Sequence, residues 1–127
     1  MLRSIIVAAS LLLSSCPVAE PIEALGSYEA RKDGVWETLA LNADGTYLLT
    51  SATEGRPQAV HAGRWQLSSV AGGCQRIVLA NFTSQLADQG RPYVRSGEDW
   101  STCIERSVLG KTRIVVDDDA GTYYVRR

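Results

Sequence analysis

The residue types that carry out catalysis are scarce in this sequence and badly placed for acting together. His61 is the only histidine, and no Ser-His-Asp, Cys-His or two-histidine metal set can be recognised around it. Glu98 and Asp99 are adjacent, so on a strand they would point to opposite faces and could not share a substrate as an acid and a base. We therefore predict a protein that is not an enzyme, with no catalytic residues, no cofactor and no metal ligands.

The acidic run at Asp117, Asp118 and Asp119 is the one segment that suggests calcium. An EF-hand loop begun at Asp117 would need its twelfth ligand one position beyond Arg127. A solvated acidic turn is the better interpretation of this run.

Three ionisable residues stand apart from this pattern, because alternation along predicted strands places each of them on an apolar face. Glu37 shares a face with Val35, Leu39 and Leu41; His61 with Gly63, Trp65 and Leu67; Arg106 with Trp100, Ile104 and Val108. In a small barrel these three side chains would point inward, where they could form a ligand site at the mouth. The alternative is structural: Glu37 and Arg106 form a buried ion pair near a rim.

The N-terminus has the organisation of an export signal. One positive charge at Arg3 precedes an apolar run at residues 5–13, which is far too short to span a bilayer. The following residues Leu13-Ser14-Ser15-Cys16 resemble the lipobox of bacterial lipoproteins, in which the cysteine thiol receives a diacylglycerol before cleavage. We predict a signal peptide at residues 1–15 and lipidation of Cys16; the alternative is an ordinary signal peptide followed by a cysteine.

Residues 16–24 form the predicted lipidated cysteine and tether, with two prolines and no periodicity, and residues 25–127 form a single domain. The tether reaches at most about 26 Å when extended, which keeps the domain close to its membrane. Pro17 stands where an aspartate would signal retention in the inner membrane, by resemblance to enterobacterial sorting. This predicts a location in the cell envelope, on the outer membrane facing the periplasm.

The two remaining cysteines, Cys74 and Cys103, form an even pair in an oxidising compartment, which predicts a structural disulfide. A metal or redox pair is the alternative, but the sequence has no C-x-x-C.

Removing Arg3 with the signal leaves twelve Lys and Arg against fourteen Asp and Glu, scattered along the chain. Without a basic stripe, nucleic acid is excluded as a partner.

Short β-rich runs separated by turn residues follow the signal, and no long segment has helical periodicity. We predict strands at residues 26–31, 35–41, 46–51, 60–67, 76–82, 93–96, 100–108, 112–116 and 122–126, with a possible helical turn at 83–90. Residues 32–34 and 42–45 are predicted hairpin turns because Asp-Gly supplies the positive φ that tight reversals need. A third turn with Asp and Gly, at residues 117–121, precedes Thr122-Tyr123. The pattern indicates an all-β fold, a small antiparallel up-and-down barrel of about eight strands.

Several of these runs resemble a known family. The segments Gly26-Ser27-Tyr28, residues 37–47, Gly63-Arg64-Trp65-Gln66-Leu67 and Ile77-Val78-Leu79 are similar to the barrel of NlpE-type envelope lipoproteins and related lipocalin-like domains, over about sixty residues. The resemblance implies a lipocalin-like barrel in the envelope. That family carries a C-x-x-C linked to copper and redox sensing near its first strands, which this sequence lacks, so its metal chemistry is not implied.

Two functions fit these observations. The first is a non-enzymatic binding or interaction module, an inhibitor or sensor held on the membrane through Cys16, whose partner is an envelope protein or a small ligand. The second is a lipocalin-like carrier with an apolar ligand inside the barrel. The carrier needs a hollow lumen, whereas Tyr47 with Trp36 or Trp65 is large enough to fill one of this size.

Overall fold

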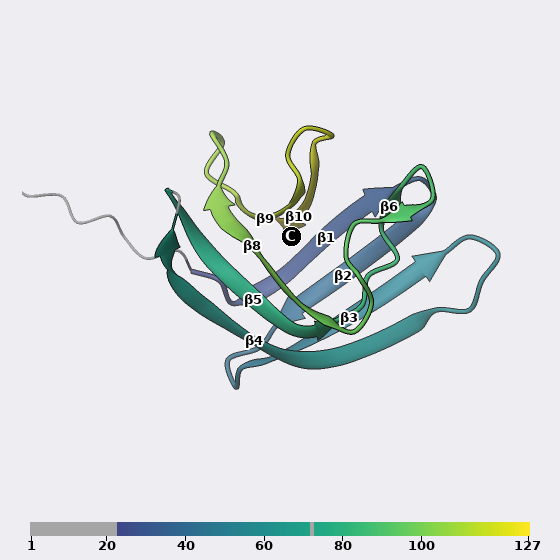
Figure 1. Ribbon diagram of the computed structural model, residues 1–127, viewed down its shortest axis with the longest axis horizontal. Helices are drawn as coiled ribbons and strands as arrows, with labels where there is room; N and C mark the ends of the chain where they lie inside the picture. Colours follow the sequence, from purple (N-terminus) through teal and green to yellow (C-terminus); the bar gives the residue numbers. More distant parts are fainter. Residues whose placement is uncertain (1–22, 72) are drawn as a thin grey trace, which may run out of the picture.

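Eight antiparallel strands close into a barrel in the order β1-β10-β9-β8-β5-β4-β3-β2. The structure, a computed structural model, describes residues 23–71 and 73–127. Each barrel strand pairs with the next along the chain, apart from a short β6-β7 hairpin between β5 and β8, as Figure 1 shows. The predicted up-and-down barrel of about eight strands is therefore confirmed.

The strand bounds follow the turn residues closely. The barrel strands are β1 (Gly26–Lys32), β2 (Val35–Leu41), β3 (Thr46–Thr53), β4 (Ala59–Ala71), β5 (Cys74–Phe82), β8 (Glu98–Arg106), β9 (Thr112–Asp117) and β10 (Thr122–Arg126), and the hairpin is β6 (Ala87–Asp88) with β7 (Arg91–Pro92). In the β1–β2 turn, Asp33 and Gly34 have φ of 49° and 82°. Two positive φ values are what a two-residue type I′ hairpin requires, so this predicted turn is confirmed.

Two local predictions are wrong, and both concern the segment between β5 and β8. Residues 93–96 form no strand, because apolar Val94 is buried as part of a loop rather than through strand alternation. Residues 83–90 form no helical turn. Gln89 and Gly90 have φ of 51° and 81° and so form the tight β6–β7 turn, while the backbone N–H of Gln85 donates to a side chain instead of a helical carbonyl.

The interior of the barrel is filled by side chains. Phe82 stacks on Trp100 with ring centroids 5.0 Å apart and meets the edges of Tyr47 and Tyr124 at 5.6 Å and 6.4 Å. Tyr47, Phe82 and Tyr124 are buried among the aliphatic residues of the core. Of the tryptophans expected to fill the lumen, Trp36 is 42% exposed on the outer face, and Trp65 is half-buried with its indole N–H donating to the carbonyl of Asn42.

Gly63 is required by its neighbour in the core. A Cβ at this position would lie 2.5 Å from the hydroxyl oxygen of Tyr47 and 2.6 Å from two of its ring carbons. We expect Gly63→Ala to lower the free energy of unfolding by about 1–3 kcal/mol, because the buried ring must move out of an already filled core. Urea unfolding measures this. The same substitution in a Tyr47→Leu background is expected to cost much less; an equal cost in both backgrounds would contradict the contact.

The disulfide between Cys74 and Cys103 is confirmed. It joins the neighbouring strands β5 and β8 across a Cα–Cα distance of 5.7 Å. Cys103 alternates with buried Ile104, which places the bond on the outer surface of the barrel wall.

The predicted signal peptide and Cys16 lie outside the described residues, as does most of the tether. Ala24, assigned above to the tether, is buried in the core, and its carbonyl accepts a hydrogen bond from the hydroxyl of Tyr28 at 2.6 Å. Ala24 is therefore part of the folded domain rather than of the tether. Residues 23–71 and 73–127 contain no helix, and so none that could cross a bilayer.

Candidate functional site

One end of the barrel is closed by residues 83–97, which we call the plug loop. Its apolar side chains Leu86 and Val94 are buried in the core. In Figure 1 the loop, with β6, lies beside the ends of β1, β2 and β3. Two contacts with those strands hold it there: the hydroxyl of Thr53 donates to Gln85 Oε1 at 2.5 Å, and Lys32 pairs with Asp88 at 4.0 Å.

The carboxylate of Glu37 is the main polar anchor of the plug loop. It is fully buried, as the alternation predicts. Its Oε1 accepts hydrogen bonds from the hydroxyls of Ser84 at 2.6 Å and Tyr124 at 2.5 Å. Its Oε2 accepts from the hydroxyl of Ser51 at 2.5 Å and from the backbone N–H of Gln85 at 2.8 Å. Four donors therefore compensate a buried carboxylate, and they tie together β2, β3, β10 and the plug loop.

The alternative interpretation, a buried ion pair between Glu37 and Arg106, is wrong. Arg106 is the last residue of β8, opposite Thr112, and its side chain is exposed. Since β8 begins at the plugged end and runs away from it, its final residue reaches the other end of the barrel. Within residues 23–71 and 73–127, no ion pair joins Glu37 to a basic side chain.

His61 does not join Glu37 either. Its half-buried ring lies 6.0 Å from the ring of Tyr47, and Nε2 hydrogen-bonds to the carbonyl of Asn81 at 2.5 Å. Asn81 has a φ of 51° within a break in the β5–β8 register, so His61 stabilises this irregular backbone. Glu37, His61 and Arg106 therefore do not form the single inward site that alternation suggested.

The residues that do surround Glu37 were not singled out from the sequence. Ser51 lies opposite Glu37 in the β2–β3 hairpin. This pairing follows from the register that the Asn42–Gly45 turn sets, so it could have been predicted from the sequence. Ser84 and Tyr124 come from segments 47 and 87 residues away, and no local signal places them there. The acidic run is confirmed as a turn between β9 and β10, in which Asp117 accepts from the N–H of Ala120 at 3.2 Å.

Because of the buried tyrosines, the free energy of unfolding depends on pH in the alkaline range. Burial raises the pKa of Tyr47 from 10.0 to about 12, with a smaller contribution from the charge of Asp99. Burial, followed by the charge of Glu37, holds the pKa of Tyr124 well above 10.0. Above pH 10 the unfolded chain releases these protons while the folded chain keeps them, so the folded state binds more protons. Each contribution is intact below pH 10 and is lost as pH rises toward the folded pKa.

We therefore expect the free energy of unfolding to fall steadily between pH 10 and about 12. Urea unfolding across this range measures the slope. Tyr47→Phe removes one of the tyrosines whose pKa is raised, so it should make the slope shallower, even though it costs stability at neutral pH. A slope unchanged by that variant would contradict the assignment.

On the outside of the barrel, three adjacent strands present a surface without charge, which we call the uncharged face. It consists of eight outward residues of β2, β3 and β4, which are Trp36, Thr38, Ala40, Leu48, Thr50, Ala52, Val60 and Ala62. It ends at Ala62, because the next outward residue of β4 is Arg64. The register sets Leu48 beside Ala40 and Ala62, and Thr50 beside Val60. Val60 is 64% exposed, and Arg31 borders the face with its guanidinium 4.2 Å from the ring of Trp36.

Comparison with known proteins adds no relative: no family model, curated protein or solved structure matches this chain. The resemblance to NlpE-type lipoproteins stays a prediction from the quoted segments. Function therefore has to be argued from the barrel itself.

Proposed function

We propose that this chain is a lipid-anchored protein of the bacterial cell envelope that acts as a non-enzymatic interaction module. It binds a partner protein on the outside of its barrel rather than a small molecule within it. The observation that carries the proposal is the filled interior, in which Tyr47, Phe82, Trp100 and Tyr124 occupy the centre and the plug loop closes one end.

The filled interior weighs against the carrier alternative. A barrel that carries an apolar ligand keeps its lumen free of large side chains, as lipocalin-type barrels do. Here a ligand would have to displace stacked aromatic rings and the hydrogen bonds that hold Glu37 to Ser84 and Gln85. The outer surface is therefore the better place for recognition.

The uncharged face is the surface we assign to the partner. The centre of a protein interface is depleted in charged residues, because a buried charge must be paired or pay for lost hydration. Burying Leu48 and Val60 removes only apolar surface from water, which favours association. At one edge, the exposed Trp36 supplies a residue type that is enriched among those that dominate binding energy.

The anchor in this proposal is the lipid predicted on Cys16. Each buried methylene contributes about 0.8 kcal/mol, and stable attachment needs more than one chain, which a multiply acylated cysteine provides. The tether is short enough to keep the barrel close to the bilayer. The location that we propose is the outer membrane, with the barrel facing the periplasm.

Site-specific photo-crosslinking in the native host tests the interaction surface. A crosslinking amino acid is placed at position 48 or 60 on the uncharged face, or at the control position Arg113 on β9. The proposal expects the same partner protein to be captured from positions 48 and 60 and not from 113. Equal capture from all three positions, or from none, would contradict the assignment.

The purified partner then provides the quantitative test. Val60→Asp should weaken its binding at least tenfold, because a charge is buried without a counter-ion. The free energy of unfolding should fall by no more than about 1 kcal/mol, since the side chain is exposed in the free barrel and only the strand preference of valine over aspartate is lost. If the affinity for the partner did not change, the uncharged face would not be the surface that binds it. A small apolar molecule copurifying in equimolar amount would instead favour the carrier.

A further inference from the structure

The barrel closes through a short seam between β1 and β10. Their ladder contains two register pairs, Tyr28 with Arg126 and Glu29 with Val125. Continuing that register would pair Arg31 with Tyr123, but the strands have separated by then. The separation leaves a groove of about 360 Å³, which we call the seam groove. Its lining residues are Glu29, Ala30, Arg31, Lys111, Tyr123, Val125, Arg126 and Arg127.

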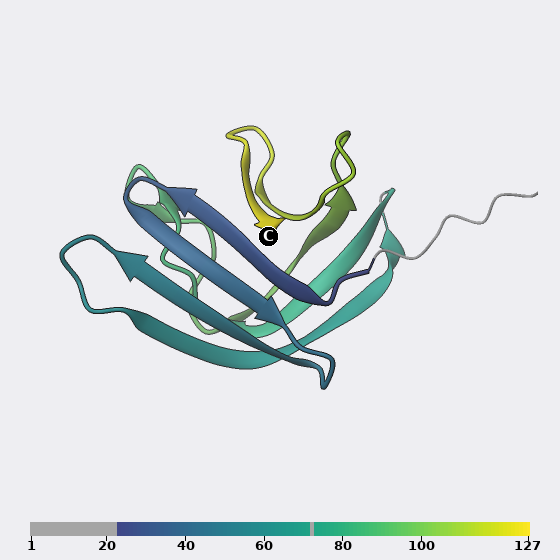
Figure 2. The ribbon, with the colours of Figure 1, turned by 180° about the vertical axis from the view of Figure 1, so that it is seen from behind.

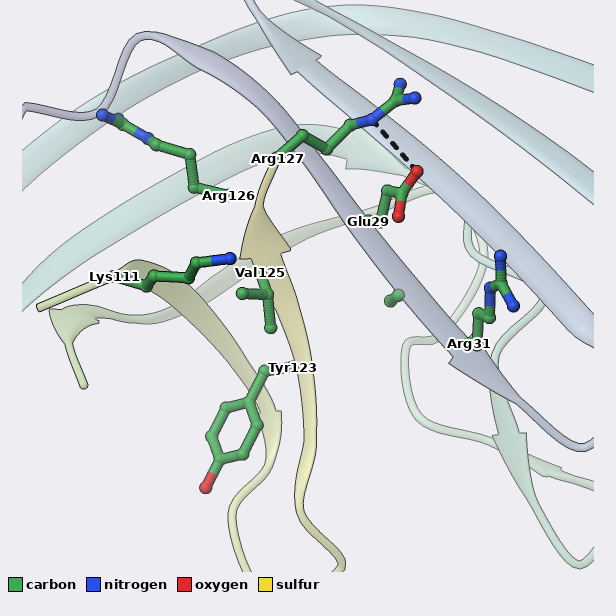
Figure 3. A pocket seen from close by; sticks show the side chains of 8 residues that line it. Glu29, Arg31, Lys111, Tyr123, Val125, Arg126 and Arg127 are labelled. Atoms are coloured by element: carbon green, nitrogen blue, oxygen red, sulfur yellow. Dashed lines mark ion pairs between the residues drawn. The ribbon is translucent and has the colours of Figure 1, made fainter. Parts of the chain in front are cut away.

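The seam groove concentrates positive charge in a chain whose net charge is −1. Four of the thirteen basic residues line it, against Glu29 as the one acid among the lining residues. The guanidinium of Arg126 is turned toward the carbonyls of Leu25 and Glu23, so Arg31, Lys111 and Arg127 are the cations on the outer side. Glu29 is already paired with Arg127 at 3.0 Å. Figure 3 shows Arg127 and Arg31 around Glu29, and Lys111 on the opposite side of β10. The cations are thus spread along the groove, which suits a surface of several anionic groups better than one small anion.

The chain leads toward its N-terminus from beside this groove. The guanidinium of Arg126 donates to the carbonyl of Leu25 at 2.9 Å and also contacts the carbonyl of Glu23. Glu23 lies seven residues after Cys16. Seven extended residues span at most about 25 Å, so a lipid on Cys16 would keep the seam groove close to the bilayer surface. Figure 2 shows from behind how residues 23–25 lead into the start of β1.

We propose that the seam groove binds the phosphate headgroups of anionic lipids in the membrane that holds the chain. The inference rests on the proposed anchor, which supplies the membrane at short range. Basic residues near an anionic surface each strengthen binding about fivefold. Contact through the seam groove, between β1 and β10, would orient the barrel and leave the uncharged face of β2, β3 and β4 free for a partner.

The test uses the chain from residue 16 onward with Cys16→Ser, so that binding is independent of lipidation. Cosedimentation compares vesicles of phosphatidylglycerol and phosphatidylcholine with vesicles of phosphatidylcholine alone. We expect binding to the anionic vesicles only, and a loss of about 25-fold on the double substitution Arg31→Gln and Lys111→Gln. The matched control, Arg56→Gln with Arg91→Gln, removes the same charge elsewhere and should lose less than about threefold, since it acts only through long-range attraction.

Equal losses in both double variants would overturn the proposal, because binding would then follow net charge and not the seam groove. A second arm titrates inorganic phosphate and follows the backbone amide resonances of Arg31 and Tyr123. Saturable phosphate binding without vesicle binding would overturn it in favour of a free phosphate ligand. Failure of the anchor is measured separately, by the mass of the native protein, so the failure of the anchor and the failure of headgroup binding can be distinguished.

Discussion

Replacing Glu37 with alanine is expected to lower the free energy of unfolding by about 4 kcal/mol, the largest effect of any substitution proposed for this protein. The change removes the acceptor of four hydrogen bonds inside the barrel. Each buried donor left without a partner costs about 1–3 kcal/mol, although some will find water once the plug loop loosens. Such a loss is a large fraction of the stability of a small domain, so the variant should be close to unfolding at 37 °C.

Urea unfolding of the variant measures its free energy of unfolding. Hydrogen exchange shows which segments lose protection. Exchange should rise most in the plug loop, whose Gln85 N–H donates to Glu37. Glu54→Ala, an exposed glutamate in the β3–β4 turn, is the matched control and should change stability by less than about 0.5 kcal/mol. A Glu37→Ala variant as stable as this control would show that the carboxylate does not hold the plug loop.

The second large effect is expected from the disulfide. Replacing Cys74 and Cys103 together by serine should lower the free energy of unfolding by about 3–4 kcal/mol, because the bond closes a loop of 29 residues in the unfolded chain. The two cysteines link β5 to β8 on either side of the segment that contains the plug loop. Because Cys74 begins β5 and Cys103 lies near the end of β8, the bond lies toward the end of the barrel opposite the plug loop, and its loss should loosen that end.

Thermal unfolding of the double variant and of the reduced protein measures the contribution of the bond. Both should unfold at similar, lower temperatures, since each removes the same cross-link. A reducing agent added to the double variant should change nothing. If the double variant matched the oxidised protein in stability, the barrel would not depend on this link.

The features that could be predicted from the sequence are those set by neighbouring residues. Strand alternation placed Glu37 and Leu39 on the inner face, and Asp33-Gly34 fixed the first hairpin, because both depend on local backbone geometry. The plug loop could not be predicted. Its apolar residue Val94 resembles a strand residue in the sequence, and only the fold brings Ser84 to a carboxylate 47 residues away.

The candidate site shows the same division. Arg106 lies two residues after the buried Ile104, so strand alternation assigns it to the same face, as predicted. Alternation does not show that Arg106 is the last residue of its strand, where even an inward side chain is exposed to solvent. The uncharged face was also present in the sequence, as alternate outward positions of three strands. Recognising it required the register that sets Leu48 between Ala40 and Ala62.

The central claim, that this barrel is held on a membrane as a lipoprotein, is tested most directly by the intact mass of the protein extracted from membranes of its native host. The account predicts residues 16–127 with acyl chains on Cys16 and two hydrogens fewer for the Cys74–Cys103 bond, and a Cys16→Ser variant without acyl chains. An unacylated, soluble native product would contradict the account. Cys16 would then be a free thiol. Neither the proposed membrane anchor nor the proposed binding of lipid headgroups would then have a membrane at short range.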